Sequence, residues 1–405
     1  MTVRYFALRI WLTAAALGTA LALPITSFAQ TAGDLFDPLV MHEIRLTINT
    51  RDLQKIREQY GDDTYYTSDM QWRNIRVRNA GVRSRGGASR NPDKLGLRVD
   101  FDRYVTGQRF LGLKSIVLKN LWQDGSFMHE QLAMSFFARM GQPASRESFC
   151  RLYINNEFQG LYSIVESVDN AYLKRTLGEN NGYLYSYQLQ SPWRGEYLGD
   201  EFEPYKTRFQ PQNHERETDA MLYLPIHDWI REVNESDGPT WRERVEEYLD
   251  LAQFVTHAAL ESFLAEDDGL LGANGMNNFF LYRFQDSKRH RFITWDQDGA
   301  FLVPDYSIFQ RTEDNVLFAR AFAYPDLRDL YFQVLESAAA SAAEDNWLES
   351  EIDRIAGLVG SAVEQDSKKP FSTEAFYESV EALKHFARIR PTLVRQQILS
   401  AHARR

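Results

Sequence analysis

Oxygen-bearing side chains that could bind a metal ion and a phosphate donor are concentrated in the stretch 266–301. The candidates are Asp268, Asn278, Asp296 and Asp298. Two short runs between them, 279–284 and 291–295, are rich in aromatic and β-branched residues and are separated by a polar turn, which predicts a β-hairpin. A hairpin brings its outer ends together, so we expect the amide before the first run and the carboxylates after the second to converge. Hard oxygen donors beside a further carboxylate are what Mg²⁺-dependent phosphoryl transfer requires.

Each of these pieces has a simpler interpretation when it is taken alone. An Asp-Gly step such as the one at Asp268 is common in plain turns. Asp296 and Asp298 are two positions apart, so in a strand both would face the same side and could belong to a solvated face. Their order in the chain is more specific: a helix, an Asp loop, an Asn, a hairpin and an Asp-x-Asp. Protein kinases present a catalytic-loop Asp, a metal-binding Asn and a second metal-binding Asp in this order.

A loop of small residues earlier in the chain, 86–90, could lie against phosphate groups. It follows Arg85 and contains Ser89. Backbone N–H groups in such a loop can approach phosphate oxygens closely, and adjacent arginines supply positive charge. A plain turn with solvated arginines is the alternative interpretation of this segment.

A lysine and a glutamate with the relative placement of a kinase ion pair follow this loop. Lys119 ends a predicted strand, 115–118, and Glu130 lies in the first turns of the helix that comes next. The alternative is a solvated surface pair.

The elements that must position these residues fall into two groups along the chain. Alternating apolar and polar residues between 39 and 166 predict a mostly antiparallel sheet with one inserted helix. Its predicted strands are 42–48, 72–77, 81–85, 97–101, 115–118, 149–154 and 160–165. Glu166 falls at the end of the last strand, where the connection between two kinase lobes would be. Beyond it helices predominate, apart from the hairpin and an irregular insertion at 190–216, and the helix 251–265 leads into the Asp268 loop.

The first residues indicate export. Arg4 and Arg9 precede an apolar run, 10–23, and small residues at a cleavage site follow, which together predict a signal peptide at 1–29 rather than a membrane span. A short linker at 30–38 is expected after the cleavage point. No later stretch approaches the length needed to cross a bilayer, so we expect a soluble, periplasmic or secreted protein and not a transmembrane one.

Charge and cysteine content exclude some partners and some kinds of stabilisation. The 405 residues carry a formal net charge of −10, and removal of 1–29, which contains two arginines and no acid, would bring it to −12. Such an acidic balance argues against nucleic acid or an anionic membrane as the main partner. The single cysteine, Cys150, cannot form an internal disulfide, and its apolar neighbours predict a buried small side chain.

Several segments together resemble the spore-coat CotH kinase family of atypical, secreted or surface-associated protein kinases. The matching segments are 81–89, 152–168, 268–282, 293–298 and the closing helices around 383–399. The first, GVRSRGGAS, is similar to the family's Gly-Ile-Arg-x-Arg-Gly-Asn-Ser-Ser but has Gly87-Ala88 where the family usually has Asn-Ser. Thr294 also stands where proline commonly precedes the family's Trp-Asp. The likeness covers residues 40–400 in sequential order.

The resemblance implies an α+β, two-lobed, atypical protein-kinase-like fold. An antiparallel-sheet N-lobe would occupy 39–167, and a mostly helical C-lobe would occupy 168–400. The implied activity is ATP-dependent phosphorylation of Ser or Thr hydroxyls on a protein substrate, with Mg²⁺ or Mn²⁺ as cofactor.

Carried over position by position, the resemblance gives the acidic candidates distinct roles. Asp268 would be the base or orienting carboxylate for the attacking hydroxyl. Asn278 and Asp296 would hold the metal ions with help from Asp298, and which of the two aspartates dominates is open.

The other candidates would bind the nucleotide. They are Arg85, Ser89, Lys119, Glu130 and Glu166. The first two would lie near the phosphates and the last near the adenine. Lys119 would contact the α- and β-phosphates with Glu130 as its partner, and Lys94 is the competing candidate for this lysine.

Two other functions are compatible with the sequence. A catalytically inactive kinase-fold protein, with a binding or envelope-structural role, is favoured by the scarcity of ATP outside the cytoplasm, whereas the complete set of acidic residues favours an enzyme. A metal-dependent phosphoester hydrolase would use the same acidic cluster without a nucleotide.

Overall fold

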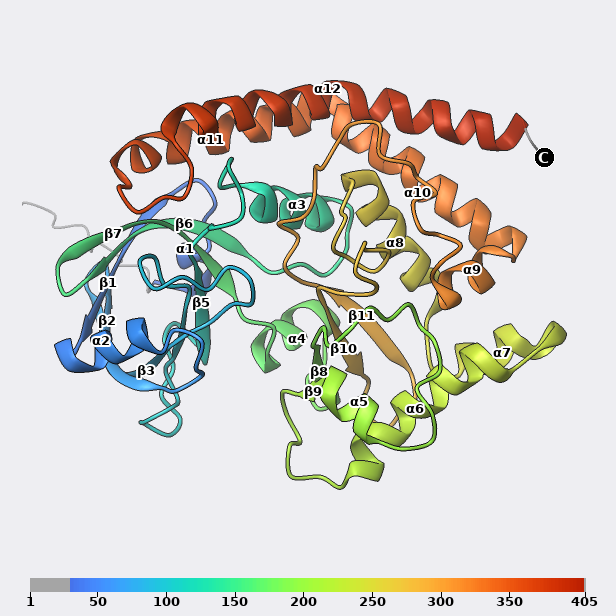
Figure 1. Ribbon diagram of the computed structural model, residues 1–405, viewed down its shortest axis with the longest axis horizontal. Coiled ribbons are helices and arrows are strands. Elements are labelled where there is room, and N and C mark those ends of the chain that lie inside the picture. Colours follow the sequence, from blue (N-terminus) through green and yellow to red (C-terminus); the bar gives the residue numbers. More distant parts are fainter. Residues whose placement is uncertain (1–29, 404–405) are drawn as a thin grey trace, which may run out of the picture.

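The computed structural model describes residues 30–403, and the expected signal peptide at 1–29 lies outside this range. Figure 1 shows a strand-rich N-terminal part, coloured blue to green, beside a C-terminal part in which helices surround a second sheet. The segment 30–38, expected as a linker, contains the short helix α1 (Ala32–Leu35), and Leu35 is fully buried in the N-terminal core.

The N-terminal strands close into a barrel in the order β1-β2-β3-β4-β5-β7-β6. Their bounds are β1 (Met41–Ile48), β2 (Tyr66–Trp72), β3 (Ile75–Ser84), β4 (Leu97–Asp100), β5 (Ser115–Lys119), β6 (Glu147–Ile154) and β7 (Glu157–Glu166). The strand β1 runs parallel to β6, whereas the other neighbours are antiparallel. The sequence pattern predicts the mostly antiparallel sheet but not its closure, because alternation marks the buried face of a strand and not its partner.

Alternate side chains of these strands fill the barrel interior. Along β1, Ile44, Leu46 and Ile48 are buried and the residues between them are partly or fully exposed, as a period of two requires. The helix α2 (Thr50–Glu58) packs its apolar face on the same cluster. Cys150 is fully buried in it, which confirms the prediction of a small apolar core residue.

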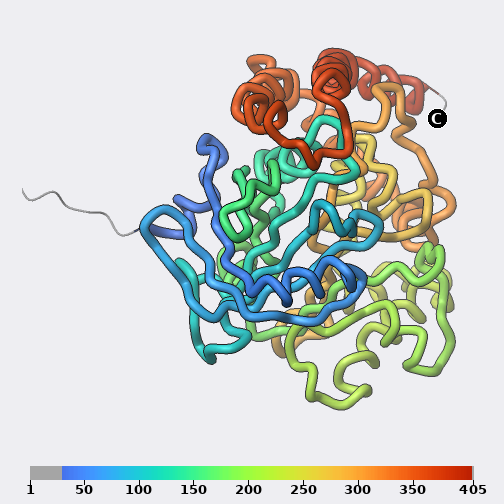
Figure 2. The backbone as a smooth tube through the Cα atoms, turned by 60° about the vertical axis from the view of Figure 1, so that its left-hand side comes forward, coloured from blue at the N-terminus to red at the C-terminus, as the bar shows by residue number. Residues whose placement is uncertain are grey.

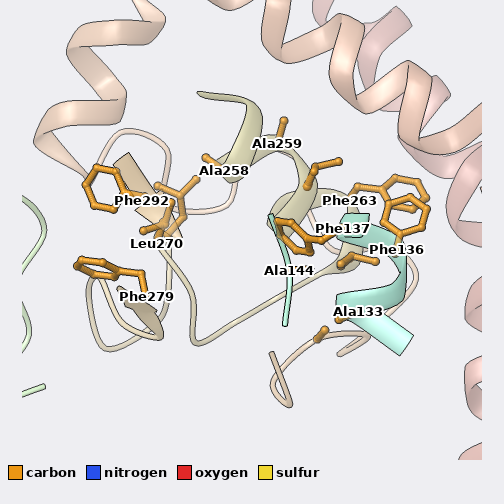
Figure 3. Close-up of a cluster of buried hydrophobic side chains, with 14 of the residues drawn as sticks. Ala133, Phe136, Phe137, Ala144, Ala258, Ala259, Phe263, Leu270, Phe279 and Phe292 are labelled. Atoms are coloured by element: carbon orange, nitrogen blue, oxygen red, sulfur yellow. The ribbon is translucent and has the colours of Figure 1, made fainter. Parts of the chain in front are cut away.

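The helix α3 (His129–Arg139) follows β5 and packs against α8 (Leu251–Leu264). Aromatic side chains meet between the two helices: Phe137 contacts His257, and Figure 3 shows Phe136 beside Phe263. The rings of Phe136 and Phe263 are stacked with their centroids 5.2 Å apart. This contact fixes α3 relative to the helix that leads into Asp268.

The second sheet has the strand order β11-β10-β8-β9. Its strands are β8 (Tyr183–Tyr187), β9 (Phe209–Pro211), β10 (Phe279–Arg283) and β11 (His290–Thr294). The strands β10 and β11 are antiparallel, with Phe279 opposite Thr294, which confirms the predicted hairpin. The backbone N–H of Trp295 donates to the carbonyl oxygen of Asn278 at 3.1 Å. The register therefore brings the amide before β10 next to the start of the Asp-x-Asp segment.

Helices make up most of the remaining chain. Those within residues 30–403 are α4 (Asn170–Leu177), α5 (Glu203–Arg208), α6 (Asp219–Glu235), α7 (Trp241–Glu246), α9 (Val316–Phe322), α10 (Pro325–Ala343), α11 (Trp347–Gln365) and α12 (Thr373–Ala403). Figures 1 and 2 show α11 and α12, in orange to red, lying along one side of the molecule. The helix α11 contacts β7 of the barrel, and α12 contacts α10 and α11. No helix in the described range combines the length and the apolar character of a bilayer-spanning segment.

Arg390 of α12 is fully buried and binds backbone carbonyls from two segments. Its guanidinium donates to the carbonyl oxygens of Ser262 and Phe263 at 2.5 and 2.8 Å, and to those of Pro304 and Tyr306 at 3.0 and 2.6 Å. Burial lowers the pKa of Arg390 to about 10. The side chain therefore stays charged at neutral pH and ties the end of α8 to the segment that follows the Asp-x-Asp.

Two parts of the chain differ from the sequence prediction in their local structure. The hairpin of β2 and β3 turns at Arg73-Asn74, inside the predicted strand 72–77, and Arg73 has a left-handed φ of 51°. The residues 66–71 (YTSDMQ) are mostly polar, so their pattern does not indicate a strand. The insertion at 190–216 is not wholly irregular, because it contains α5 and β9.

Candidate active site

A cleft of about 1110 Å³ lies between the barrel and the second sheet. Residues of 83–98 and Val117 line it on the barrel side, and residues of 186–212, 267–280 and 295–302 line it on the other. The candidate residues that line it are Arg85, Ser89, Asp268, Asn278, Asp296 and Asp298. An adjoining narrow pocket, which shares several of these residues, adds Lys119 and Glu130. The structure therefore brings together candidates that are up to 213 positions apart in the sequence.

Lys119 is the last residue of β5 and is held between carboxylates from two other segments. Its Nζ forms ion pairs with Glu130 of α3 and with Asp296 after β11. The side chains of Lys119 and Glu130 are 9% and 3% exposed, whereas that of Asp296 is 29% exposed. Burial by itself would lower the pKa of Lys119, but the negative charges of Asp296 and Glu130 outweigh it and raise the pKa. The lysine is therefore kept as a cation beside the cleft.

Asp296 reaches Lys119 because the chain turns sharply after β11. The φ of Asp296 is 54°, in the left-handed region that Asp and Asn tolerate better than other L-residues. Burial tends to raise the pKa of Asp296, whereas Lys119 and Arg85 bring it below its ordinary value. The ring centroid of Trp295 lies 5.3 Å from Nζ of Lys119 and 5.8 Å from Cζ of Arg85. The indole thus lies beside both cations, and the carboxylate of Asp296 is ion-paired with Lys119.

Asp268 lies in the loop after α8, where two side-chain amides hold its carboxylate. Its Oδ2 accepts hydrogen bonds from Nδ2 of Asn277 at 3.0 Å and Nδ2 of Asn278 at 2.9 Å. Burial raises the pKa of Asp268 against the lowering effect of these amides, and the charge of Asp296 adds to the rise. The amides therefore fix the orientation of a carboxylate that lines the cleft.

The donors around Asp298 have the chemistry of a Mg²⁺ or Mn²⁺ site. Carboxylates of Asp296 and Asp298 and the amide oxygen of Asn278 are hard ligands. Burial and the charge of Asp296 raise the pKa of Asp298 well above its ordinary value, as expected for like charges placed together. Within residues 30–403, no group of three or more His, Cys, Asp and Glu side chains forms a ready-made metal cluster. Because Mg²⁺ in phosphoryl-transfer sites uses one or two carboxylates plus phosphate oxygens, the residues present fit the ion.

The loop 85–90 lies at the same cleft and is anchored to the end of β5. Gly86 has a φ of 123°, and a Cβ there would be 2.6 Å from Oγ of Ser89, so this position requires glycine. Nε of Arg90 donates to the carbonyl oxygen of Gly86 at 2.7 Å. Nδ2 of Asn120 donates to the carbonyl oxygen of Ser89 at 2.8 Å. The loop is thus held in one position relative to the strand that carries the candidate lysine.

Within the described residues 30–403, the candidate Glu166 lies outside both the cleft and the adjoining pocket. Its buried carboxylate is ion-paired with Arg146 at 2.7 Å and with Arg175 at 2.5 Å. These two guanidinium groups hold the carboxylate at the end of β7. The next residues, Ser167 and Val168, line the cleft instead.

Lys94, the competing lysine, is also outside the cleft. It is fully buried, and its Nζ donates to Oδ2 of Asp366 at 2.7 Å. Asp366 belongs to the connection between α11 and α12.

Comparison with known proteins identifies the family of this chain. The sequence profile described as CotH kinase protein matches residues 82–394. The chain belongs to the CotH kinase family. A curated relative is the inner spore coat protein H of Bacillus subtilis (strain 168), which is 23% identical over 366 residues, covering 87% of this chain and 96% of that protein. A solved structure, the Helicobacter pylori proinflammatory kinase CtkA, is 11% identical, with a TM-score of 0.31, covering 78% of this chain and 94% of that one.

Membership of the CotH kinase family makes the chain a kinase-like protein with a mixed helix and sheet fold. The matched range, 82–394, contains every candidate residue from Arg85 to Asp298.

Two buried glutamates of this CotH family member support the acidic loops and are not among the predicted residues. Glu261 of α8 accepts a hydrogen bond from the backbone N–H of Leu270, and Glu266 accepts one from that of Asp268, each at 2.7 Å. Burial and the charge of Glu261 raise the pKa of Glu266 well above its ordinary value. The available signal is a glutamate inside the apolar helix sequence LAQFVTHAALESFL, because a buried charge requires polar partners.

Proposed function

We propose that this CotH family member is an exported protein kinase, periplasmic or secreted, that uses ATP and Mg²⁺ or Mn²⁺ to phosphorylate Ser or Thr hydroxyls of a secreted or envelope protein. The observation that carries the proposal is the ion-paired Lys119, held by Glu130 and Asp296 beside the cleft that Asp268 lines. Phosphoryl transfer needs positive charge at the phosphates, a carboxylate at the attacking hydroxyl and hard ligands for a metal ion. The barrel would serve as the N-lobe and the rest of the chain as the C-lobe.

Two cations supply charge to the nucleotide phosphates in this proposal. Lys119 contacts the α- and β-phosphates, and Arg85 lies beside them. Glu130 of α3 also holds Lys119, so Asp296 can turn from the lysine towards a metal ion without releasing the cation. Ser89 and the backbone N–H groups around it face the same phosphates.

The acidic residues divide into a metal-binding and a hydroxyl-orienting group. Asn278, Asp296 and Asp298 hold the metal ion, which when bound neutralises charge on the phosphate oxygens. Asp268 accepts a hydrogen bond from the attacking hydroxyl and takes its proton. Because two amides bind Oδ2 of Asp268, the direction of this carboxylate is set before the substrate arrives.

Apolar side chains suited to a nucleotide base also line the cleft. Val117 of the barrel and Phe280 of the second sheet both line it, as does Val168. We therefore assign the base to these side chains. Glu166 instead holds the end of β7 through its two arginines.

The experiment that tests the function measures transfer of labelled γ-phosphate from ATP, with Mg²⁺ or Mn²⁺, to the protein itself or to a Ser-rich protein. Asp268→Asn and Asp296→Asn should each lower the rate by at least about 100-fold. Asparagine is chosen because Asp296 has a left-handed φ. The matched control is Asp286→Asn, in the exposed turn at the other end of the same hairpin, which should keep the wild-type rate.

The alternatives give different outcomes in the same assay. No transfer, and no thermal shift with ATP and metal, would refute the kinase and favour an inactive binding or envelope protein. Metal-dependent hydrolysis of a phosphoester without any nucleotide would favour the hydrolase.

A further inference from the structure

One buried carboxylate joins the two acidic loops of the proposed site. Glu261 lies in the last turn of α8 and is 2% exposed. Its Oε2 accepts a hydrogen bond from the backbone N–H of Leu270, two residues after Asp268, at 2.7 Å. Its Oε1 accepts one from Nε2 of Gln297, the residue between the two aspartates after β11, at 3.3 Å. The same side chain thus contacts the loop of the proposed base and the segment of the proposed metal ligands.

Glycines allow both loops to approach the buried glutamates. A Cβ at Gly269 would lie 2.5 Å from the carboxylate of Glu261. A Cβ at Gly299 would lie 2.4 Å from Oε1 of Glu266, the atom that accepts the N–H of Asp268. A side chain at either glycine would therefore push one acidic loop away from its carboxylate.

The hydrogen bonds at position 261 require that both terminal atoms of the side chain are acceptors. A carboxylate provides about four lone-pair sites and can accept from several donors at once. Here the donors are the N–H of Leu270 and the amide of Gln297, and Nε2 of His257 lies 3.1 Å from Oε1 of Glu261. A glutamine at position 261 has a single acceptor oxygen, so it would lose the bond to Leu270 or the bond to Gln297.

We propose that Glu261 is a positioning residue that sets the separation between Asp268 and the metal-binding aspartates. This inference rests on the proposed phosphoryl transfer, in which Asp268 must align a hydroxyl with a phosphate held through Asp296 and Asp298. A displacement of about 1 Å between such groups costs on the order of 100-fold in rate. Glu261 acts through the two loops and is buried behind them.

The first test is Glu261→Gln, which keeps the shape of the side chain and removes one acceptor. We expect kcat to fall about 10- to 100-fold, the usual effect of losing a supporting contact behind a site. The KM for ATP should stay near its wild-type value, because Lys119 and Arg85 keep their own contacts. The melting temperature should fall moderately, because one buried donor loses its acceptor, so kcat is measured at a temperature at which the variant is fully folded.

The exchange variant E261Q/Q297E separates positioning from the loss of a charge. In it the new amide at position 261 can donate to the new carboxylate at position 297, and its carbonyl oxygen can accept from Leu270. We expect kcat to recover at least tenfold relative to E261Q. The matched control is Gln253→Met, which removes a glutamine hydrogen bond from the same helix to the carbonyl oxygen of Phe292 (3.1 Å) and should leave kcat unchanged.

Three results would overturn the inference: wild-type kcat in E261Q, a loss of kcat that only follows a loss of stability, or no recovery in the exchange variant. If E261Q does not fold, Gln297→Met cuts one of the two links, and a wild-type kcat in that variant overturns the inference as well. A wild-type protein that transfers no phosphate would instead refute the proposed function. The two failures are therefore distinguishable.

Discussion

Lys94 and Lys119 are both paired with carboxylates from distant parts of the chain, but they lie in different surroundings. Lys94 is fully buried against Asp366. Burial lowers the pKa of Lys94, and Asp366 opposes the shift only in part. Lys119 has two carboxylates, which raise its pKa in spite of burial, and it lines a pocket that opens on the cleft.

The partners explain the difference between the two lysines. Oδ2 of Asp366 also accepts the N–H of Leu161 at 3.0 Å, and its Oδ1 accepts the N–H of Lys368 at 2.9 Å. Asp366 is therefore a structural link between the barrel and the last helices. Asp296, in contrast, is 29% exposed and lines the cleft. In the proposed function Lys119 is the lysine of the site because one of its two carboxylates, Asp296, also lines the cleft, whereas Asp366 does not.

The largest expected effect in this comparison is a loss of stability when Lys94 is replaced. Lys94→Met leaves the buried charge of Asp366 without a cation and should lower the free energy of unfolding by about 3–5 kcal/mol. The measurement is a urea unfolding curve. The double variant K94M/D366N removes both charges and keeps an acceptor for Leu161, so it should recover most of the loss. A K94M protein as stable as the wild type would contradict the structural role.

The next effect is on catalysis at Lys119. The charge-neutral pair K119M/E130Q should lower kcat by about 10²- to 10³-fold, because it removes a cation aimed at developing charge. The melting temperature should change little, since the two most buried charges are neutralised together and the remaining carboxylate, Asp296, is 29% exposed to solvent. In the same assay K94M/D366N should keep the wild-type kcat. Equal losses in the two double variants would break the distinction between the lysines.

The smallest effect concerns a buried base whose pKa is lowered, in contrast to the raised pKa of Lys119. Burial lowers the pKa of His42 to about 4, and its Nδ1 accepts a hydrogen bond from Nε1 of Trp72 at 3.2 Å. The unfolded chain therefore binds more protons at this residue between about pH 6.5 and pH 4, so stability should fall as the pH is lowered through this window. His42→Asn keeps an acceptor for Trp72 and cannot be protonated. Urea unfolding between pH 4.5 and 7 should show a weaker pH dependence for H42N, and an unchanged slope would contradict the assignment.

The sequence was most informative where chemistry depends on order along the chain. The hairpin follows from two aromatic and β-branched runs separated by a polar turn, and its geometry alone brings Asn278 towards Asp296. The contact between Lys119 and Glu130 follows from a strand end and the helix after it. The role of each residue is part of the proposed function, but their proximity could be expected before the structure was known.

Contacts between distant segments could not be predicted in this way. The pattern does not reveal that Asp296 pairs with Lys119, because a left-handed turn after β11 redirects the side chain. Nor does the sequence pattern reveal that Glu166 is ion-paired with two arginines, since the positions of these arginines depend on the packing of α4 and β6. Glu261 reads as part of an apolar helix, and its partners lie on loops whose shape comes from Gly269 and Gly299.

Arg390 also makes the site depend on a late part of the chain. It binds the carbonyl oxygens of Ser262 and Phe263, just before the Asp268 loop, and those of Pro304 and Tyr306, just after the Asp-x-Asp. Domains fold as units while chains emerge N-terminus first, and Arg390 is made after every residue that it holds. The acidic loops therefore gain their last support only when α12 docks. A chain without α12 lacks this support of the two loops, so the proposed activity should require the chain through Arg390.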